Sequence, residues 1–377
     1  MMKKITIGQL CKPNVGQIKL DDDRFIDYFD IASIDNINKK ITGFTTYTFV
    51  EAPSRARRMI KKDNILVSTI RPNLNAVALF DMNTQNVPVA STGFCVLDCK
   101  EDTNPRFLFY YLQSRFFVNE MVSQATGASY PAVSDKIVRS AHIPVYSYDE
   151  QVVIADMLDK VTYIIAKRKQ QLAKLDELVK ARFVEMFSDT RAEEPLATLC
   201  TFIDYRGKTP EKAERGLPFI TAKNIKMHHM SFEIKEFISK ETYDKVMTRG
   251  FPKVGDVVFT TEAPLGNVCR IPYMKTEFYI GQRIITMQTK ALEPVYLEYA
   301  LSSDDFKRKI LEKSSGSTVT GIRSKLLEQL TIPVPPIAQQ QKFAAFVGQI
   351  EKIRLFIQKN IEKIETLKKA LMQKYFE

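Results

Sequence analysis

The chain has 377 residues, of which 45% are hydrophobic, so it is long enough for several domains with buried cores and is not a disordered protein. Its formal net charge of +11 favours a polyanionic partner, although a generic basic surface would give the same charge. No run of 18 apolar residues and no N-terminal signal segment occurs, so we expect a cytoplasmic protein with no membrane partner. The five cysteines are scattered and odd in number, which argues for reduced thiols, and the three histidines lack the spacing of a metal site.

The opening segment is the first copy of an internal repeat. Residues 7–11 (Ile-Gly-Gln-Leu-Cys) return 189 residues later as Leu-Ala-Thr-Leu-Cys, and the strand-like run at 63–75 is matched by residues 255–267. The offset is again 189 for Gly-Ala-Ser at 127–129 and for Ile-Pro-Val at 143–145. Repeating units of solenoid proteins are far shorter than this, so the sequence indicates a duplicated domain.

A long helical pattern follows each copy. Between Tyr148 and Phe187, apolar residues recur in alternating steps of four and three, and the same pattern returns 189 residues later near the C-terminus. A helix of about 35 residues spans roughly 50 Å, which corresponds to on the order of fifteen base pairs of duplex DNA. We predict that the two helices pair with each other through Ile154, Leu158, Val161, Ile165, Leu172, Leu175, Phe343, Val347, Ile350, Ile357, Ile361 and Ile364.

The predicted fold class is α+β, with two mixed α/β recognition domains related by an internal pseudo-twofold repeat and separated by two long antiparallel coiled-coil helices. The expected divisions are a first domain at 1–145, a central helix at 146–188, a second domain at 189–335 and a C-terminal helix at 336–377. Prolines at the ends of both domains lack amide donors and mark the entry into each helix.

Candidate DNA-contacting residues lie in loops of both domains, because cations neutralise phosphates and Arg or Asn side chains reach base edges. Ordinary surface loops, turn-forming asparagines and solvated cations explain each of these positions equally simply. The candidates are Arg55, Arg57, Arg58, Arg71, Asn73, Asn75, Ser129, Tyr130, Arg206, Lys208, Lys223, Asn224, Arg283, Thr318 and Arg323.

A second apolar row widens each helical stripe beyond what one partner helix needs. It serves either packing on the globular domains or docking of partner subunits. Its members are Met157, Ile164, Leu178, Phe346, Ile353 and Leu367.

The order of two globular domains and two long helices, with Ile-Pro-Val-Pro-Pro-Ile-Ala-Gln-Gln-Gln at 332–341, resembles the specificity subunits of Type I restriction-modification systems. Residues 51–58, 67–77, 127–133 and 218–225 also look like segments of their target recognition domains. The resemblance implies a non-catalytic protein without a cofactor of its own, which reads a bipartite, asymmetric site on double-stranded DNA. It implies two methyltransferase subunits that bring S-adenosylmethionine, and restriction and translocation subunits that join through the complex.

Two other classes of protein fit the sequence less well. A self-contained DNA methyltransferase or nuclease with duplicated DNA-binding domains is the alternative, but the chain lacks an Asn-Pro-Pro-aromatic or Asp-Pro-Pro-aromatic site and a glycine-rich cofactor turn. A scaffold without DNA binding is disfavoured by the positive charge and by two large mixed domains. We therefore expect no catalytic residue in this chain.

Overall fold

The computed structural model describes residues 3–13, 15–18, 24–207, 209–314 and 320–377. The chain forms two compact units: unit 1 comprises Met1–Lys169 with Gln358–Glu377, and unit 2 comprises Gln170–Ile357. Each long helix is therefore shared between the units and does not form a separate part. None of the described helices has a stretch long and apolar enough to cross a membrane.

Unit 1 contains a four-stranded sheet in the order β5-β2-β9-β6, a three-stranded antiparallel sheet β10-β7-β8 and two small strand pairs, β1-β11 and β3-β4. The strands are β1 (Lys4–Thr6), β2 (Phe25–Phe29), β3 (Ile34–Asp35), β4 (Lys40–Ile41), β5 (Thr45–Thr48), β6 (Ala56–Met59), β7 (Ile65–Ser68), β8 (Val77–Leu79), β9 (Val87–Ser91), β10 (Phe94–Leu97) and β11 (His142–Pro144). The helices are α1 (Ile7–Leu10), η1 (Ile31–Ser33), η2 (Pro72–Leu74), α2 (Pro105–Tyr111), α3 (Arg115–Gln124) and α4 (Asp135–Ser140).

Unit 2 contains a four-stranded antiparallel sheet β13-β21-β18-β19, a three-stranded sheet β17-β14-β20 and the strand pairs β12-β22 and β15-β16. The strands are β12 (Glu193–Pro195), β13 (Cys200–Asp204), β14 (Leu217–Ile220), β15 (Ile225–Lys226), β16 (His229–Met230), β17 (Phe237–Ile238), β18 (Val257–Thr260), β19 (Val268–Arg270), β20 (Tyr279–Ile280), β21 (Ile284–Thr289) and β22 (Thr331–Pro333). The helices are α6 (Leu196–Leu199), α7 (Lys240–Val246), α8 (Pro294–Ser302), α9 (Asp304–Lys313) and α10 (Ser324–Gln329).

The two units repeat one topology. The sheet β10-β7-β8 of unit 1 corresponds to β21-β18-β19 of unit 2, and the parallel pair β2 and β9 corresponds to β14 and β20. The helix caps repeat as well, since Ser114 accepts a hydrogen bond from Phe117 N at 3.2 Å and Ser303 accepts one from Phe306 N at 3.2 Å. Such a side-chain cap satisfies an amide at the N-terminus of each helix, so the repeated sequence fixes the same helix starts.

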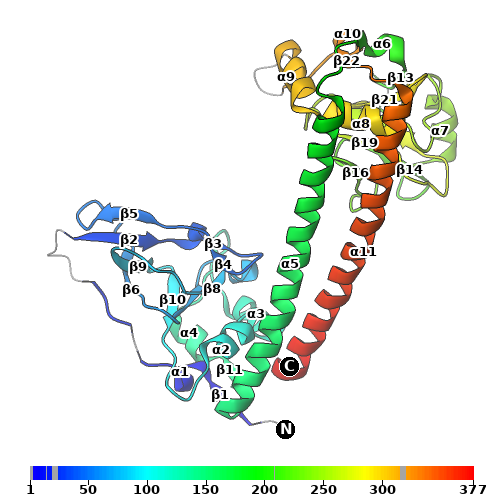
Figure 1. Ribbon diagram of the computed structural model, residues 1–377. Helices are drawn as coiled ribbons and strands as arrows, with labels where there is room; N and C mark the ends of the chain where they lie inside the picture. The colour runs from blue at the N-terminus through cyan, green and yellow to red at the C-terminus, as the bar shows by residue number, and fades with distance from the viewer. Residues whose placement is uncertain (1–2, 14, 19–23, 208, 315–319) are drawn as a thin grey trace. The chain divides into compact units, whose positions relative to one another are not determined.

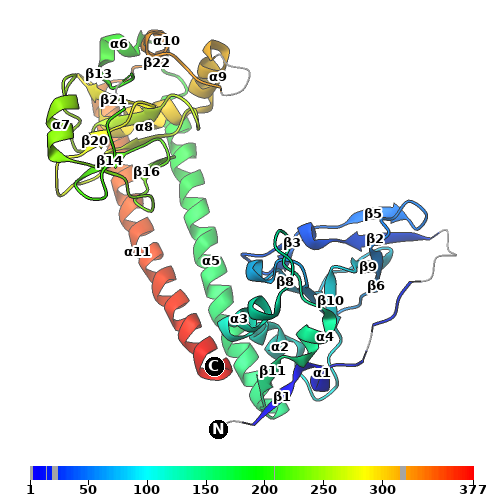
Figure 2. The ribbon, with the colours of Figure 1, turned by 180° about the vertical axis from the view of Figure 1, so that it is seen from behind.

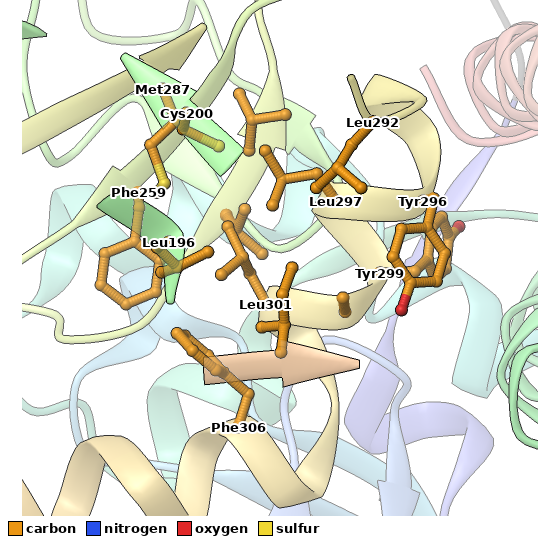
Figure 3. Close-up of a cluster of buried hydrophobic side chains, with 14 of the residues drawn as sticks. Leu196, Cys200, Phe259, Met287, Leu292, Tyr296, Leu297, Tyr299, Leu301 and Phe306 are labelled. Atoms are coloured by element: carbon orange, nitrogen blue, oxygen red, sulfur yellow. The ribbon is translucent and has the colours of Figure 1, made fainter. Parts of the chain in front are cut away.

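The helix α8 is buried on nearly all sides, which explains its continuous apolar sequence. Leu297 and Leu301 lie toward Phe259 and Met287 of the sheet, whereas Tyr296 and Tyr299 lie on another side of the helix (Figure 3). Tyr296 packs against Phe187 with ring centroids 4.9 Å apart. The core of unit 2 thus continues from the sheet through α8 to the long helices.

The long helices are α5 (Tyr148–Phe187) and α11 (Ile337–Phe376). Within unit 2 the end of α5 lies beside the start of α11, where Phe187 and Phe343 pack at 5.5 Å (Figures 1 and 2). Within unit 1 the start of α5 lies beside the end of α11, and Phe376 packs 5.4 Å from Phe107 of α2. Each helix therefore ends against the domain from which the other helix begins.

Candidate nucleic-acid interface

Two sequence stretches predicted to contact DNA meet on one surface of unit 1. Ile70, just after β7, forms an antiparallel bridge with Ala132, and Arg71 N donates to Pro131 O at 2.7 Å. Val133 N donates to Thr69 O at 2.9 Å. These contacts fix the backbone of residues 69–72. We call this segment the presenting loop of unit 1.

Arg71 is held in an outward position by this loop. Its backbone adopts the left-handed conformation with φ 50° and ψ 61°, which is uncommon and costly for a residue with a side chain. Its guanidinium lies 4.7 Å from the centroid of the Tyr130 ring, and Tyr130 is 68% exposed. No carboxylate in the described part of the chain lies within ion-pair distance of Arg71. The aromatic ring restricts the guanidinium while its hydrogen-bond donors remain available to a ligand.

The three predicted arginines that precede β7 have different surroundings; they are Arg55, Arg57 and Arg58. Arg58 pairs with Asp135 of α4, so its charge is compensated within the unit. Arg57 lies 5.8 Å from the Phe49 ring and donates to its neighbour Ala56 O at 2.9 Å. Arg55 is exposed at the start of β6, beside Thr92, and is the member of the cluster best placed for a phosphate.

Asn73 and Asn75 follow Arg71 but differ in their surroundings. Asn73 is exposed on η2. Asn75 donates its side-chain amide to Leu112 O at 2.8 Å, and its Oδ1 accepts from Lys39 Nζ at 2.8 Å. Burial, assisted by the nearby Lys368, lowers the pKa of Lys39 to about 8. The amide of Asn75 is thus used to hold the loop, which argues against its predicted contact with a base.

Unit 2 has a corresponding loop that is anchored by similar hydrogen bonds. Thr261 N donates to Arg283 O at 3.0 Å, as Thr69 N donates to Gly93 O at 2.9 Å in unit 1. Glu262 bridges to Gly321, and Ile322 N donates to Thr261 O at 3.0 Å. We call residues 261–264 the presenting loop of unit 2.

The two presenting loops share their end residues, Thr and Pro, and differ at the two positions between them. Ala263 has a left-handed φ of 45° at the position that Arg71 occupies in unit 1. Glu262 replaces Ile70. The anchoring hydrogen bonds and the left-handed residue are therefore shared, whereas the central side chains differ and the peptide bond between Ala263 and Pro264 is cis.

A pocket of about 240 Å³ adjoins the presenting loop of unit 2. Ala263 and Arg283 line it together with Lys223, which brings two predicted DNA-contacting cations to one place. Gln282 adds a carboxamide that offers both a donor and an acceptor. These side chains offer hydrogen-bond donors and an acceptor of the kind that can contact base edges of DNA.

The other predicted residues of unit 2 are dispersed. Arg206 Nε pairs with Asp204 Oδ2 at 3.0 Å. Asn224 is 1% exposed; its Oδ1 accepts from Thr221 N at 2.9 Å and its Nδ2 donates to Ser231 O at 2.9 Å. Its side chain therefore supports a turn, which argues against the predicted contact with DNA. Arg323 is exposed just before α10, as Ser129 is exposed in unit 1. Lys208 and Thr318 lie outside the described residues.

The predicted pairing residues of α5 and α11 lie on buried faces. Of the twelve, Leu172, Leu175 and Ile364 are partly buried and the others are buried. Lys169 Nζ lies 3.5 Å from Glu365 Oε1 in unit 1, and Arg354 pairs with Asp176 in unit 2. The polar pairs accompany the apolar seam in both units.

The second apolar row is largely exposed. Ile164 is 42% exposed, Leu178 47%, Ile353 47% and Leu367 51%. Met157 and Phe346 are partly buried, and Phe346 packs against the core of unit 2. The row thus combines contact with the unit's own core and apolar surface that is open to solvent.

The charged contacts that connect the domains to the helices were not predicted from the sequence. In unit 2 the buried Glu298 accepts from Arg270 Nε at 2.6 Å, and Arg270 also pairs with Glu351 of α11. In unit 1 Arg106 Nη1 donates to Asp159 Oδ2 of α5 at 2.6 Å. Periodicity finds buried apolar faces but does not reveal which charges meet across elements that are distant in sequence.

Glu262 was also missed, although it lies beside the predicted Arg283. The two residues are brought together by the pairing of β18 with β21. The signal available in the sequence was the alignment of the two copies, which places an acid where unit 1 has Ile70.

Comparisons with known proteins agree with these features. The model of the Type I restriction modification DNA specificity domain matches residues 2–177 and again residues 198–366. The Type I restriction enzyme MjaVIII specificity subunit of Methanocaldococcus jannaschii is 23% identical over 291 residues, which cover 71% of this chain and 68% of that protein. The Type I restriction enzyme HindI specificity subunit of Haemophilus influenzae is 25% identical over 225 residues, covering 56% of this chain and 48% of that protein.

Solved structures are similar in fold. A chain from a study of complex assembly and conformational transition of the type I R-M system has a TM-score of 0.64 at 23% identity, covering 99% of this chain and 97% of that one. The Type-I restriction-modification system S subunit from M. genitalium has a TM-score of 0.58 at 15% identity, covering 100% and 96%. The protein described here therefore belongs to the Type I restriction-modification DNA specificity family, as one of its specificity subunits.

Proposed function

We propose that each unit of this specificity subunit reads one half of a bipartite, asymmetric DNA site through its presenting loop. The observation that carries the proposal is the shared anchoring of the two loops, in which the left-handed Arg71 of unit 1 corresponds to the left-handed Ala263 of unit 2. Two loops that are anchored alike but present different side chains are suited to two unlike half-sites, because base readout depends on the donors and acceptors that reach the groove.

Affinity and specificity come from different residues in this proposal. Exposed cations such as Arg55 bind phosphates and give a salt-dependent attraction to any duplex. The presenting loops contribute the contacts to base edges. The net charge of +11 supports this division, because it exceeds what the few loop arginines supply.

The long helices have two roles in the proposal. Their length sets the spacer between the half-sites, and their paired faces form an antiparallel coiled coil between units related by a pseudo-twofold repeat. The exposed row that includes Ile164, Leu178, Ile353 and Leu367 docks two methyltransferase subunits. An apolar row open to solvent on both helices is consistent with one partner for each.

The chain is non-catalytic in this proposal. S-adenosylmethionine binds to the partner methyltransferase subunits, and restriction and translocation subunits join through the complex. The alternative is a self-contained DNA-modifying enzyme, which would act without partners.

Methyl transfer distinguishes the two. The purified chain, incubated with labelled S-adenosylmethionine and duplex DNA, should transfer no methyl groups, and the same chain with methyltransferase subunits should methylate adenines in a bipartite site. Transfer by the chain alone would refute the proposal. A chimera with residues 1–140 from another specificity subunit should then change one half-site and leave the other as it was.

A further inference from the structure

Glu262 of the presenting loop of unit 2 forms an ion pair with Arg283, which lies next to the loop. Arg283 Nε lies 2.9 Å from Glu262 Oε1, and the two side chains are 53% and 43% exposed. A Cβ atom on Gly321 would lie 3.3 Å from Glu262 Cβ, so the neighbouring chain packs closely beside the acid. Glu262 is therefore bounded by backbone on one side and by the guanidinium on the other.

Both units have a guanidinium beside the presenting loop, but it comes from different positions in the chain. In unit 1 the guanidinium comes from the loop itself, whereas Ala263 has only a methyl group there. In unit 2 the guanidinium comes from Arg283, which precedes β21 and corresponds to Gly93 of unit 1. A cation is thus presented next to the loop in both units.

The carboxylate changes what Arg283 can do. A free arginine binds any phosphate, but an acid at ion-pair distance compensates its charge and repels phosphates. With Nε facing Glu262, the terminal Nη1 and Nη2 groups remain as directional donors, which match the O6 and N7 acceptors of guanine.

We propose that Arg283, positioned by Glu262, reads a guanine in the half-site of unit 2. This proposal rests on the proposed function. Glu262 is a positioning residue, because it acts on the base through the orientation and charge of Arg283.

The test is selection from a library of randomised duplexes by the full-length chain, followed by sequencing of the bound DNA. Arg283→Ala should lose the preference for guanine at one position by roughly 5- to 150-fold and leave the other half-site unchanged. Arg283→Lys keeps the charge and should also lose most of the preference, which separates base reading from charge. Arg308→Ala is the matched control, because Arg308 pairs with Asp305 at 2.9 Å on α9 of the same unit.

Glu262→Gln gives the second measurement. It should increase binding to unrelated duplex and steepen the dependence of binding on salt, because the released arginine can bind a phosphate. The inference would be overturned if Glu262→Gln left the salt slope unchanged and both Arg283 variants kept the preference for guanine. The proposed function would still stand in that case, provided that the unaltered chain selected a bipartite site. Failure of the unaltered chain to select any bipartite sequence would instead refute the proposed function.

A second inference concerns Cys11 and Cys99 of unit 1, which face each other in an antiparallel bridge. Lys12 N donates to Asp98 O at 2.8 Å and Lys100 N donates to Leu10 O at 2.9 Å, so the cysteines form the non-hydrogen-bonded pair between these bonds. Cα atoms in such a pair are about 4.5 Å apart, which lies within the range that a disulfide requires.

The two side chains lie on the same face of the strand pair, because directly opposed residues of an antiparallel pair do so. The Cys99 thiol, assisted by Arg139, lowers the pKa of Cys11, whereas Cys11 and burial raise the pKa of Cys99. Cys11 is 1% exposed, whereas Cys99 is partly exposed and accessible to a small reagent. Unit 2 has a natural control, since its equivalent Cys200 faces Thr289.

We propose that Cys11 and Cys99 form a reversible disulfide by exchange with a small disulfide such as oxidised glutathione. Cys99, the more accessible thiol, loses its proton and attacks the small disulfide, which forms a mixed disulfide; the leaving sulfur takes up the proton as one small thiol. Cys11 then attacks Cys99 Sγ and releases the second small thiol, so two protein thiols are oxidised and one small disulfide is reduced.

The full-length chain should be equilibrated with graded ratios of reduced and oxidised glutathione, alkylated and digested without reduction. A peptide linking Cys11 to Cys99 should appear in mass spectra, disappear in Cys99→Ser and persist in Cys95→Ser, while Cys200 stays alkylated. Absence of this peptide at every ratio, or a link that uses Cys95 instead, would overturn the inference.

Discussion

Gln151 of α5 accepts a hydrogen bond on its side-chain oxygen from the backbone N–H of Asn104 at 2.9 Å. Its amide nitrogen donates to Tyr146 O at 3.0 Å, and only 4% of the residue is exposed. Gln340 makes the same two contacts in unit 2, with Glu293 N at 2.9 Å and Pro335 O at 2.8 Å. A buried glutamine therefore joins the first turn of each long helix to the start of α2 or α8.

Replacing this glutamine should destabilise unit 1. Gln151→Ala leaves a buried backbone amide without its acceptor, and such a loss costs about 1–3 kcal/mol. Chemical denaturation should detect a lower free energy of unfolding than in Gln349→Ala, which removes an exposed glutamine of α11. Equal effects of the two substitutions would argue against a structural role for the Gln151 contacts.

Removal of the aromatic ring beside Arg71 should weaken the reading of one half-site. Tyr130→Leu removes the cation–π contact, which is worth about 0.5–1 kcal/mol at an exposed site, whereas Tyr130→Phe keeps a ring. Competition binding should show a two- to fivefold loss for Tyr130→Leu on the cognate site and little loss for Tyr130→Phe. If both variants bind as the unaltered chain does, the ring does not position Arg71 on DNA.

These side chains show where prediction from sequence reaches its limit. The heptad period and the offset of 189 can be read directly from the sequence, and the observed helices α5 and α11 follow them closely. Asn75 and Asn224 instead resemble base-reading residues in sequence, but their amides are used by nearby backbone groups. The pairing of Glu262 with Arg283 depends on which strands lie side by side, and that is decided by packing far along the chain.

The stability of unit 1 should depend on pH through Lys39. Its folded-state pKa of about 8 lies below the ordinary 10.5, so between these values the unfolded chain binds more protons and stability rises with pH. Lys39→Met has no such titration. The free energy of unfolding of wild type should therefore rise relative to that of Lys39→Met from pH 8 to 10.5. The difference between the two proteins should stay constant from pH 6 to 7. A flat difference across both ranges would show that the ammonium is not desolvated.

Charge placed in the exposed helical row should block assembly with methyltransferase subunits. Ile353→Asp removes an apolar side chain that is 47% exposed and introduces a charge that a buried interface would have to desolvate. Co-purification should fall sharply, while thermal unfolding of the isolated chain stays close to that of the unaltered protein. Lys363→Asp, an exposed substitution on the same helix, provides the comparison. Normal assembly of Ile353→Asp would place the docking surface elsewhere.

Lengthening both helices together should lengthen the DNA spacer. The ion pairs of Lys169 with Glu365 and of Asp176 with Arg354 show that an insertion in α5 needs a matching one in α11 to preserve the seam. Seven residues inserted between Lys169 and Asp176, and seven between Arg354 and Glu365, add one heptad to each helix, or about 10 Å. At about 3.4 Å per base pair this is about three base pairs. Sequencing of methylated DNA from cells with the assembled complex should then show both half-sites unchanged and farther apart. Insertion in α5 alone should disrupt the pairing and abolish recognition, and a changed half-site with an unchanged spacer would show that helix length does not set the spacing.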